Sequence, residues 1–462
     1  MKTHNGATTY YSTGNPLLEF FSKAGSLFEK RKSYYGNEAT ALDLFLNAWA
    51  VKPETAMKLL LWCRDIRGGA GNRSGSRSIL TWLANQEPAW VKANLDLIPK
   101  YGRWDDLSAL VGTPVEQDAL SLWSNAILEG NQLAAKWAPR DNKSGKVLAS
   151  KLRTVLGLSA KNYRKLVVKT TKVVETQMCN NSWDGIEYSH VPSLAMSRYG
   201  KAFKKHDLNR FSQFLGDASD PTSTVSINAG VVYPHDLLRA DKEVANAQFG
   251  AMPNYFKTDM RVMPVIDLSG SMTVKVSGSI SAIDIAIGLG LYASDRLGST
   301  NPFYRKLIPF SRNAMFHSWS GKDFYSTAQG LKRNGEVANT NLEAVFNLLL
   351  NTATFMNVTN AQMPNVLLII SDGQFDSMVD QGSNTVVEKC LKAWNAAGYD
   401  SPKIVYWNTS GYAGSPATAY SVDCGLVSGF SPSILKAVFE GDDFSPMGIM
   451  HKTLENYTVT VP

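Results

Sequence analysis

The apolar positions of the chain follow a helical spacing over its first half. From about residue 16 to residue 215 they recur at three- and four-residue intervals, most clearly in 41–50, 55–63, 107–111, 119–128 and 163–178. Gly, Pro and Asn clusters separate these segments at intervals typical of helix pairs. The pattern predicts an all-α, HEAT-like helical-repeat solenoid or ring, although no strict sequence period is present.

The second half has a different pattern, in which short apolar runs alternate with helical stretches. Strands are predicted at 263–266, 303–309, 365–371 and 403–407, and helices at 281–297, 341–350, 384–397 and 432–439. Apolar strands that alternate with helices indicate an α/β, Rossmann-like domain with a parallel sheet covered on both faces.

The chain is therefore predicted to be multidomain, as its 462 residues also favour. Residues 1–15 form an irregular arm, residues 16–258 the helical domain with a connecting segment, and residues 259–462 the α/β domain.

Two acidic loops follow two of the predicted strands. Asp267, Ser269 and Ser271 come after the first strand, and Asp372 comes after the strand at 365–371. Sites in such folds lie at the carboxyl ends of strands, so these loops are expected to share one edge of the sheet. Carboxylate and hydroxyl oxygens suit Mg²⁺ or Mn²⁺, and neutral hydroxyls leave the ion able to accept an anionic oxygen from a partner. The simpler alternative is an unmetallated turn with helix-capping side chains.

This arrangement resembles the metal-ion-dependent adhesion site of von Willebrand A domains, whose pattern is DxSxS, then T, then D. Asp267, Ser269 and Ser271 match the first element, and Asp372 matches the third. Thr340 matches the second, in a loop between the two strands.

Charge is distributed unevenly along the chain. The net charge is +9 for residues 1–250 and −2 for the remainder, which suggests a polyanionic partner for the first half. Between 136 and 172 there are eleven Lys/Arg and one acidic residue, so this stretch is either a nucleic-acid-binding surface, as we favour, or a solvated basic face. The candidate nucleic-acid-binding residues, which the family resemblance given below assigns to RNA, are Lys136, Arg140, Lys143, Lys146, Lys161, Arg164, Lys165, Lys169 and Lys172. Trp137, Tyr163 and Trp183 lie nearby and either stack on bases or belong to the core.

Three local phrases in the helical half, together with the predicted A domain, carry a family resemblance. They are RDIRGGAGNR at 64–73, IPKYGRWDDL at 98–107 and AAKWAPR at 134–140. With the segment NSWDGIEYSHVPS at 181–193, they resemble the Ro/TROVE superfamily over roughly residues 16–455. The resemblance implies a ring of helical repeats closed by the A domain, which binds small noncoding or misfolded RNAs and is not a catalyst.

Two other functions remain open. One is an adhesion-type module in which the metal captures a carboxylate of a protein partner. The other is a metal-dependent phosphotransferase that uses Asp267 as nucleophile, although Ser269 stands where such enzymes need a second carboxylate. We expect no enzymatic activity.

The remaining features are expected to be structural. The Gly68–Gly71 segment either cradles a phosphate or, as we favour, forms an interhelix turn. The four cysteines form no CxxC pair, and no apolar run is long enough to span a bilayer, so we expect a cytoplasmic protein without a membrane partner.

Overall fold

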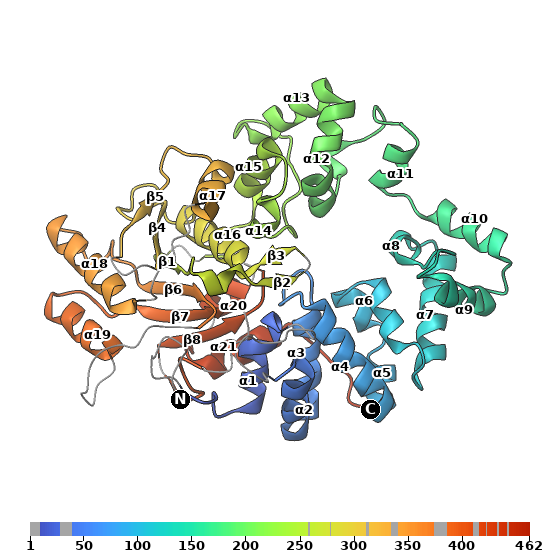
Figure 1. Cartoon of the computed structure of the whole chain (residues 1–462), viewed down its shortest axis with the longest axis horizontal. Coiled ribbons are helices and arrows are strands. Elements are labelled where there is room, and N and C mark those ends of the chain that lie inside the picture. The colour runs from blue at the N-terminus through green and yellow to red at the C-terminus, as the bar shows by residue number, and fades with distance from the viewer. Residues whose placement is uncertain are drawn as a thin grey trace.

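A computed structural model describes residues 10–27, 39–256, 259–277, 279–310, 314–333, 341–373, 386–409, 415–421, 423–431, 434–440 and 443–462. A helical region is followed by a mixed α/β region, as the apolar patterns predict (Figure 1). Within the described residues, no helix is both long and apolar enough to cross a membrane.

The helices of the first region follow one another along an arc that leaves the α/β region at α1, beside β8, and returns to it at α14 and α15, which contact α16 and α17 (Figure 1). In chain order the elements are α1 (Pro16–Lys23), η1 (Ala24–Ser26), α2 (Ala41–Val51), α3 (Pro53–Arg64), α4 (Arg73–Gln86), α5 (Pro88–Ala93), α6 (Leu97–Tyr101), η2 (Trp104–Leu110), α7 (Glu116–Leu128), α8 (Gln132–Trp137), α9 (Lys146–Leu156), α10 (Ala160–Thr170), α11 (Val174–Cys179), η3 (Tyr188–His190), α12 (Ser193–His206), α13 (Leu208–Ser219), α14 (Pro234–Leu237) and α15 (Lys242–Ala251).

The α/β region is built on one six-stranded sheet and a two-stranded hairpin. Its elements are β1 (Val262–Ile266), η4 (Gly270–Thr273), β2 (Lys275–Ser277), β3 (Ile280–Ser281), α16 (Ala282–Asp295), β4 (Lys306–Pro309), β5 (His317–Ser318), α17 (Phe324–Arg333), α18 (Leu342–Phe355), β6 (Val366–Ser371), α19 (Val386–Ala396), β7 (Lys403–Asn408), β8 (Cys424–Ser428), α20 (Ile434–Glu440) and α21 (Pro446–Leu454).

The large sheet has the strand order β5-β4-β1-β6-β7-β8, and only the β4–β5 pair is antiparallel. The chain adds strands on one side of β1 and then crosses to the other side, so β1 stands where the winding direction reverses. Doubly wound sheets bind their ligands at the carboxyl ends of the strands at this point.

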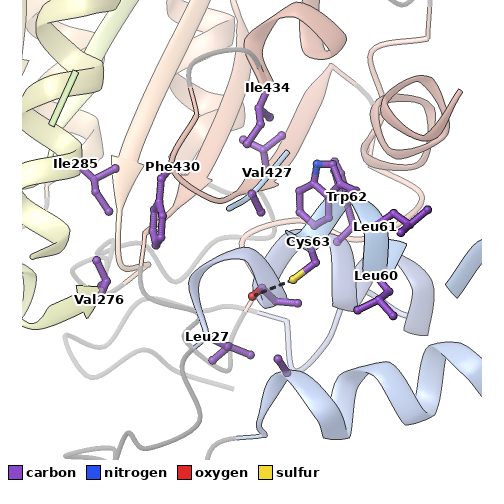
Figure 2. Packing of buried hydrophobic residues seen from close by; sticks show 14 of the residues in the cluster. Leu27, Leu60, Leu61, Trp62, Cys63, Val276, Ile285, Val427, Phe430 and Ile434 are labelled. Carbon is purple, nitrogen blue, oxygen red and sulfur yellow. Dashed lines mark hydrogen bonds between the residues drawn. The ribbon is translucent and has the colours of Figure 1, made fainter. Parts of the chain in front are cut away.

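Buried side chains on both faces of the sheet explain why its strands are continuous apolar runs. Val262 and Ile266 point into a core that they share with α16 and the helical region, whereas Met263 and Val265 pack with α18 and α19. The first core crosses from α3 to the end of β8, where Trp62 and Cys63 lie near Val427 (Figure 2).

The two ends of the chain also join the regions. The backbone of Tyr10 pairs with that of Ser415, and Asn15 caps α1 by accepting from two backbone amides. Near the other end, the Tyr457 hydroxyl donates to Asp65 at 2.9 Å. The helical and α/β regions are therefore packed against each other by segments from both ends.

Some predicted elements are wrong in extent. The single helix predicted over 163–178 is two helices, because Val173 takes an extended conformation between α10 and α11. Residues 107–111 belong largely to the 3-10 helix η2 rather than to an α-helix. The strand predicted to begin at 303 begins at Lys306, directly after Arg305 with a φ of +52°.

Strand β8 was not predicted. Its glycine, Gly425, breaks the apolar run of this short strand. A β-carbon at Gly425 would lie 2.8 Å from Cδ1 of Ile449, so the glycine is what lets α21 pack closely against β8.

Candidate functional site

The two predicted acidic loops meet at the carboxyl edge of the sheet. Strands β1 and β6 are parallel neighbours, and each is followed at once by a buried aspartate, Asp267 and Asp372. The backbone amide of Asp267 donates to the carbonyl of Ile370 at 2.9 Å. The Ser371 hydroxyl donates to Oδ2 of Asp267 at 2.7 Å, which joins the two loops directly.

The hydroxyl groups of the first loop also converge. The Oγ atoms of Ser269 and Ser271 lie 3.0 Å apart, and the backbone amide of Ser269 donates to Oδ1 of Asp267 at 2.9 Å. Two neighbouring ligands of an octahedral Mg²⁺ with bonds of about 2.1 Å are separated by about 3.0 Å. The spacing of the two hydroxyls is therefore compatible with ligation of one such ion.

The donor set is composed of oxygen atoms, which is the chemistry that Mg²⁺ and Mn²⁺ prefer. In the described part of the chain, no group of three or more His, Cys, Asp or Glu side chains is arranged to hold a metal. The candidate set instead has two carboxylates, Asp267 and Asp372, and two hydroxyls, Ser269 and Ser271. Thr340, the fifth predicted ligand, lies outside the described residues.

Ser371 was missed as a site residue. Its hydroxyl donates to Asp267 and accepts from the backbone amide of Gly373 at 3.0 Å, so it orients both the carboxylate and the turn after β6. The available indication was its position: it is a polar residue at the end of an otherwise apolar strand, beside an aspartate.

A pocket of about 640 Å³ lies next to the first loop, on the β4 side. Leu268 lines it together with side chains from the end of β4 and from α17, and its polar lining includes Lys322 and Asp323. A pocket of this size beside the winding reversal is where an α/β fold accommodates the remainder of a bound ligand.

The predicted RNA-binding residues divide into two groups. Lys136 forms an ion pair with Glu175 at 3.0 Å, and Arg140 is half-buried, with burial lowering its pKa. The remaining seven are exposed, and none of them forms an ion pair within the residues described; they are Lys143, Lys146, Lys161, Arg164, Lys165, Lys169 and Lys172.

Five of the exposed cations form one stripe, which we call the α10 cationic face: Lys161, Arg164, Lys165, Lys169 and, just after the helix, Lys172. The three- and four-residue spacing of Lys161, Arg164, Lys165 and Lys169 puts these four on one side of the helix, and Lys172 follows them in the sequence just after the helix ends. The opposite side is buried through Tyr163 and Val167. Helix α10 lies on the part of the arc far from the sheet (Figure 1).

The aromatic residues near this stripe are already engaged. Tyr163 is buried and its hydroxyl donates to the carbonyl of Pro139 at 2.9 Å, so it belongs to the core. The Arg103 guanidinium lies 4.0 Å from the ring centroid of Trp137, and Trp183 stacks on His206. The core interpretation therefore holds for Tyr163, and intramolecular partners cover part of the other two rings.

The Gly68–Gly71 segment is an interhelix turn, as favoured. The amide of Ala70 donates to the carbonyl of Trp62 at 3.0 Å, and a β-carbon at Gly69 would lie only 2.1 Å from that same oxygen. Gly71 has a φ of +74°. Close backbone packing thus explains these glycines.

Comparisons with known proteins give the following similarities. The family model described as domain of unknown function DUF2828 matches residues 3–154 and 149–265, and that described as domain of unknown function DUF7788 matches residues 261–457. The chain is 25% identical to the uncharacterized protein L728 of Acanthamoeba polyphaga mimivirus over an alignment 518 positions long, which covers 99% of this chain and 87% of that protein.

Among solved structures, the Ro (RSR) protein of Deinococcus radiodurans aligns with a TM-score of 0.40 and 13% identity, covering 96% of this chain and all of that chain. An aerotolerance-related membrane protein from Bacteroides fragilis NCTC 9343 aligns with a TM-score of 0.22 and 17% identity, covering 32% of this chain and 67% of that one.

Proposed function

The chain belongs to the family described as domain of unknown function DUF2828, and we propose that this member is a cytoplasmic RNA-binding protein whose α10 cationic face contacts the phosphate backbone. The main support for RNA binding is that the five cations of this face are exposed and that none of them forms an ion pair within the described residues. A lysine or arginine already paired with a carboxylate of the protein neutralises a phosphate poorly, so it displaces few of the counterions bound to the RNA. An unpaired lysine or arginine displaces them fully and therefore contributes fully to salt-sensitive affinity.

The preference for RNA over other polyanions comes from the motif resemblance to the Ro/TROVE superfamily. In this proposal the helical arc corresponds to a HEAT-like ring, and the C-terminal region to its von Willebrand A domain. The strand order of the large sheet, in which winding reverses beside β1, supports the second correspondence.

The test is the salt dependence of binding to a fluorescent single-stranded RNA. Five phosphate contacts predict a slope of log affinity against log salt of about −3.5, from about −0.7 per contact for single strands. Changing Lys161, Arg164, Lys165 and Lys169 to Gln should reduce the slope by about 3 and weaken binding at 50 mM salt by more than about tenfold. Gln matches Lys and Arg in helix propensity, so α10 should still fold.

The matched control removes four exposed lysines elsewhere, by the changes Lys52→Gln, Lys92→Gln, Lys392→Gln and Lys436→Gln. This variant has the same net charge as the α10 variant and should keep most of the slope. If both variants lose the same affinity, binding depends on overall charge and the assignment of α10 is wrong. A DNA strand of the same sequence, bound with equal affinity, would overturn the preference for RNA.

We further propose that the carboxyl edge of the sheet binds Mg²⁺ or Mn²⁺ through Asp267, Ser269, Ser271, Asp372 and Thr340. The 3.0 Å spacing of the two serine hydroxyls beside a buried carboxylate supports this set. When bound, the ion would offer an electrophilic position to an anionic oxygen, such as a carboxylate of a protein partner. Because Ser269 replaces the second carboxylate that phosphoaspartate enzymes use, we infer a binding role and not catalysis.

Titration calorimetry with Mn²⁺ tests the metal site independently of RNA. Asp267→Ala and Asp372→Asn should each abolish the binding heat, whereas Asp400→Asn, which changes an exposed carboxylate of the same region, should leave it unchanged. Full-affinity binding in Asp267→Ala would remove this residue from the site. An adhesion-type role without RNA would be indicated by metal binding together with no measurable RNA affinity.

A further inference from the structure

Three of the four segments of the helical half that carry the family resemblance come together in space. Arg64, Arg73 and Arg77 belong to the first phrase or directly follow it, Arg103 belongs to the second, and Trp137 to the third. We call Arg64, Arg73, Arg77 and Arg103 the arginine cluster. It surrounds the adjacent aspartates Asp105 and Asp106 at the start of η2.

The inner part of the cluster is a buried ion-pair network. Asp106 is almost completely buried and accepts from Nε of Arg64 at 2.8 Å and from Nε of Arg77 at 2.7 Å. The same carboxylate accepts from the backbone amide of Arg103 at 2.8 Å. Both oxygens of Asp106 are therefore committed to holding α3, α4 and η2 together.

The outer part of the cluster has more positive than negative charge. Arg103 donates to both oxygens of Asp105, at 3.1 and 3.2 Å, Arg77 lies 3.1 Å from it, and Arg73 also pairs with it. The single carboxylate of Asp105 is thus shared by the guanidinium groups of three arginines. The four arginines and two aspartates carry a net charge of +2.

The open side of the cluster is Arg73. Its side chain is 48% exposed, compared with 25% for Arg77 and 24% for Arg103. Arg73 donates to Asp105, and most of its five N–H donors have no hydrogen-bond partner among the described residues. Burial and the neighbouring charges of Arg77 and Arg103 lower the pKa of Arg73, as expected where local negative charge is insufficient.

We propose that the arginine cluster binds a phosphate group through the guanidinium group of Arg73 on its open side, with Arg77 and Arg103 adding positive charge behind it. Arginine binds phosphate through paired N–H donors, and an anion here would offset the excess charge that Asp105 leaves. Helix α8 contacts both η2 and α10, so the cluster and the α10 cationic face lie on connected elements. The phosphate is accordingly assigned to the nucleic acid chain, and this assignment rests on the proposed function.

Inorganic pyrophosphate, titrated into the full-length protein by calorimetry, tests the cluster without any RNA. Arg73→Gln should weaken pyrophosphate binding at least tenfold. Lys92→Gln is the matched control, because Lys92 is 50% exposed, lies in the same helical region and also pairs with a single aspartate. It should change the affinity less than twofold.

A second variant separates an anion site from a purely structural network. Asp105→Asn removes one negative charge, so it should increase pyrophosphate affinity, and pyrophosphate should raise its melting temperature more than that of the unchanged protein. No detectable pyrophosphate binding, or equal affinities in Arg73→Gln and Lys92→Gln, would overturn the proposal.

RNA binding provides the last comparison. Arg73→Gln should also lower RNA affinity, while the α10 variant should lower RNA affinity and leave pyrophosphate binding intact. Loss of RNA binding only in the α10 variant would refute the assignment of the phosphate to RNA and keep the proposed function. Pyrophosphate binding without any RNA binding would refute the proposed function and leave a site for a free phosphate compound.

Discussion

Replacing Ser371 by alanine should destabilise the α/β region in a metal-dependent way. The Ser371 hydroxyl is the 2.7 Å donor to Oδ2 of Asp267, and the side chain of Asp267 is completely buried. The alanine variant leaves this carboxylate oxygen without that donor. It also removes the acceptor for the backbone amide of Gly373.

The expected loss follows from the kind of hydrogen bond removed. A hydrogen bond to a charged group contributes about 1.5–3 kcal/mol, and a buried group left without its partner belongs at the upper end of that range. Without metal, we therefore expect the free energy of unfolding to fall by about 2–3 kcal/mol. A cation bound beside Asp267 would neutralise the carboxylate, so saturating Mn²⁺ should reduce the loss to about 1 kcal/mol or less.

Urea unfolding at pH 7, with EDTA and then with excess Mn²⁺, measures both values. Ser428→Ala is the control, because Ser428 is a buried serine at the end of a nearby parallel strand whose hydroxyl donates to the neutral carbonyl of Phe21 at 2.8 Å. It should lose about 1 kcal/mol under either condition. An equal loss for Ser371→Ala with and without Mn²⁺ would refute the claim that a cation acts on Asp267.

Two further predictions concern packing and pH. Gly25→Ala should lower the free energy of unfolding by about 1–3 kcal/mol, because its β-carbon would lie 2.7 Å from Oγ of Ser428. Gly216→Ala is the control: a β-carbon there meets open space, so this change should be neutral or stabilising in the same urea assay. Burial acts to raise the pKa of Asp284, but the Lys332 ammonium and nearby donors outweigh burial and hold this pKa below its usual range. Its stabilising contribution is therefore present at neutral pH and is lost progressively as the pH falls below the usual Asp range and through the lowered pKa. Asp284→Asn should cost about 3 kcal/mol at pH 7, and this cost should shrink as the pH is lowered. Urea midpoints between pH 3 and 7 check this, and a constant difference would contradict it.

The carboxyl edge of the sheet was predictable because its determinants are local. Strands β1 and β6 are uninterrupted apolar runs, and each ends in polar residues that a parallel sheet must place at the same edge. The α10 cationic face was predictable for the same reason, since helical spacing alone aligns Lys161, Arg164, Lys165 and Lys169.

The contacts between the regions were not predictable. The backbone amide of Gly25 donates to Ser428, which is 403 positions away, and no local pattern relates these two residues. The convergence of Arg73, Arg103 and Trp137 similarly depends on how three helical segments pack. Sequence patterns identified the phrases containing these residues as distinctive but gave no information on which side chains meet.

Mapping where RNA touches the protein tests the central proposal most directly. A single-stranded RNA carrying 4-thiouridine, crosslinked to the full-length protein by ultraviolet light, should give crosslinked peptides from 143–172, with fewer of them in the α10 variant. Crosslinks confined to the carboxyl edge of the sheet, or a pattern unchanged by removal of the four cations, would contradict the proposal that α10 is the RNA-binding surface.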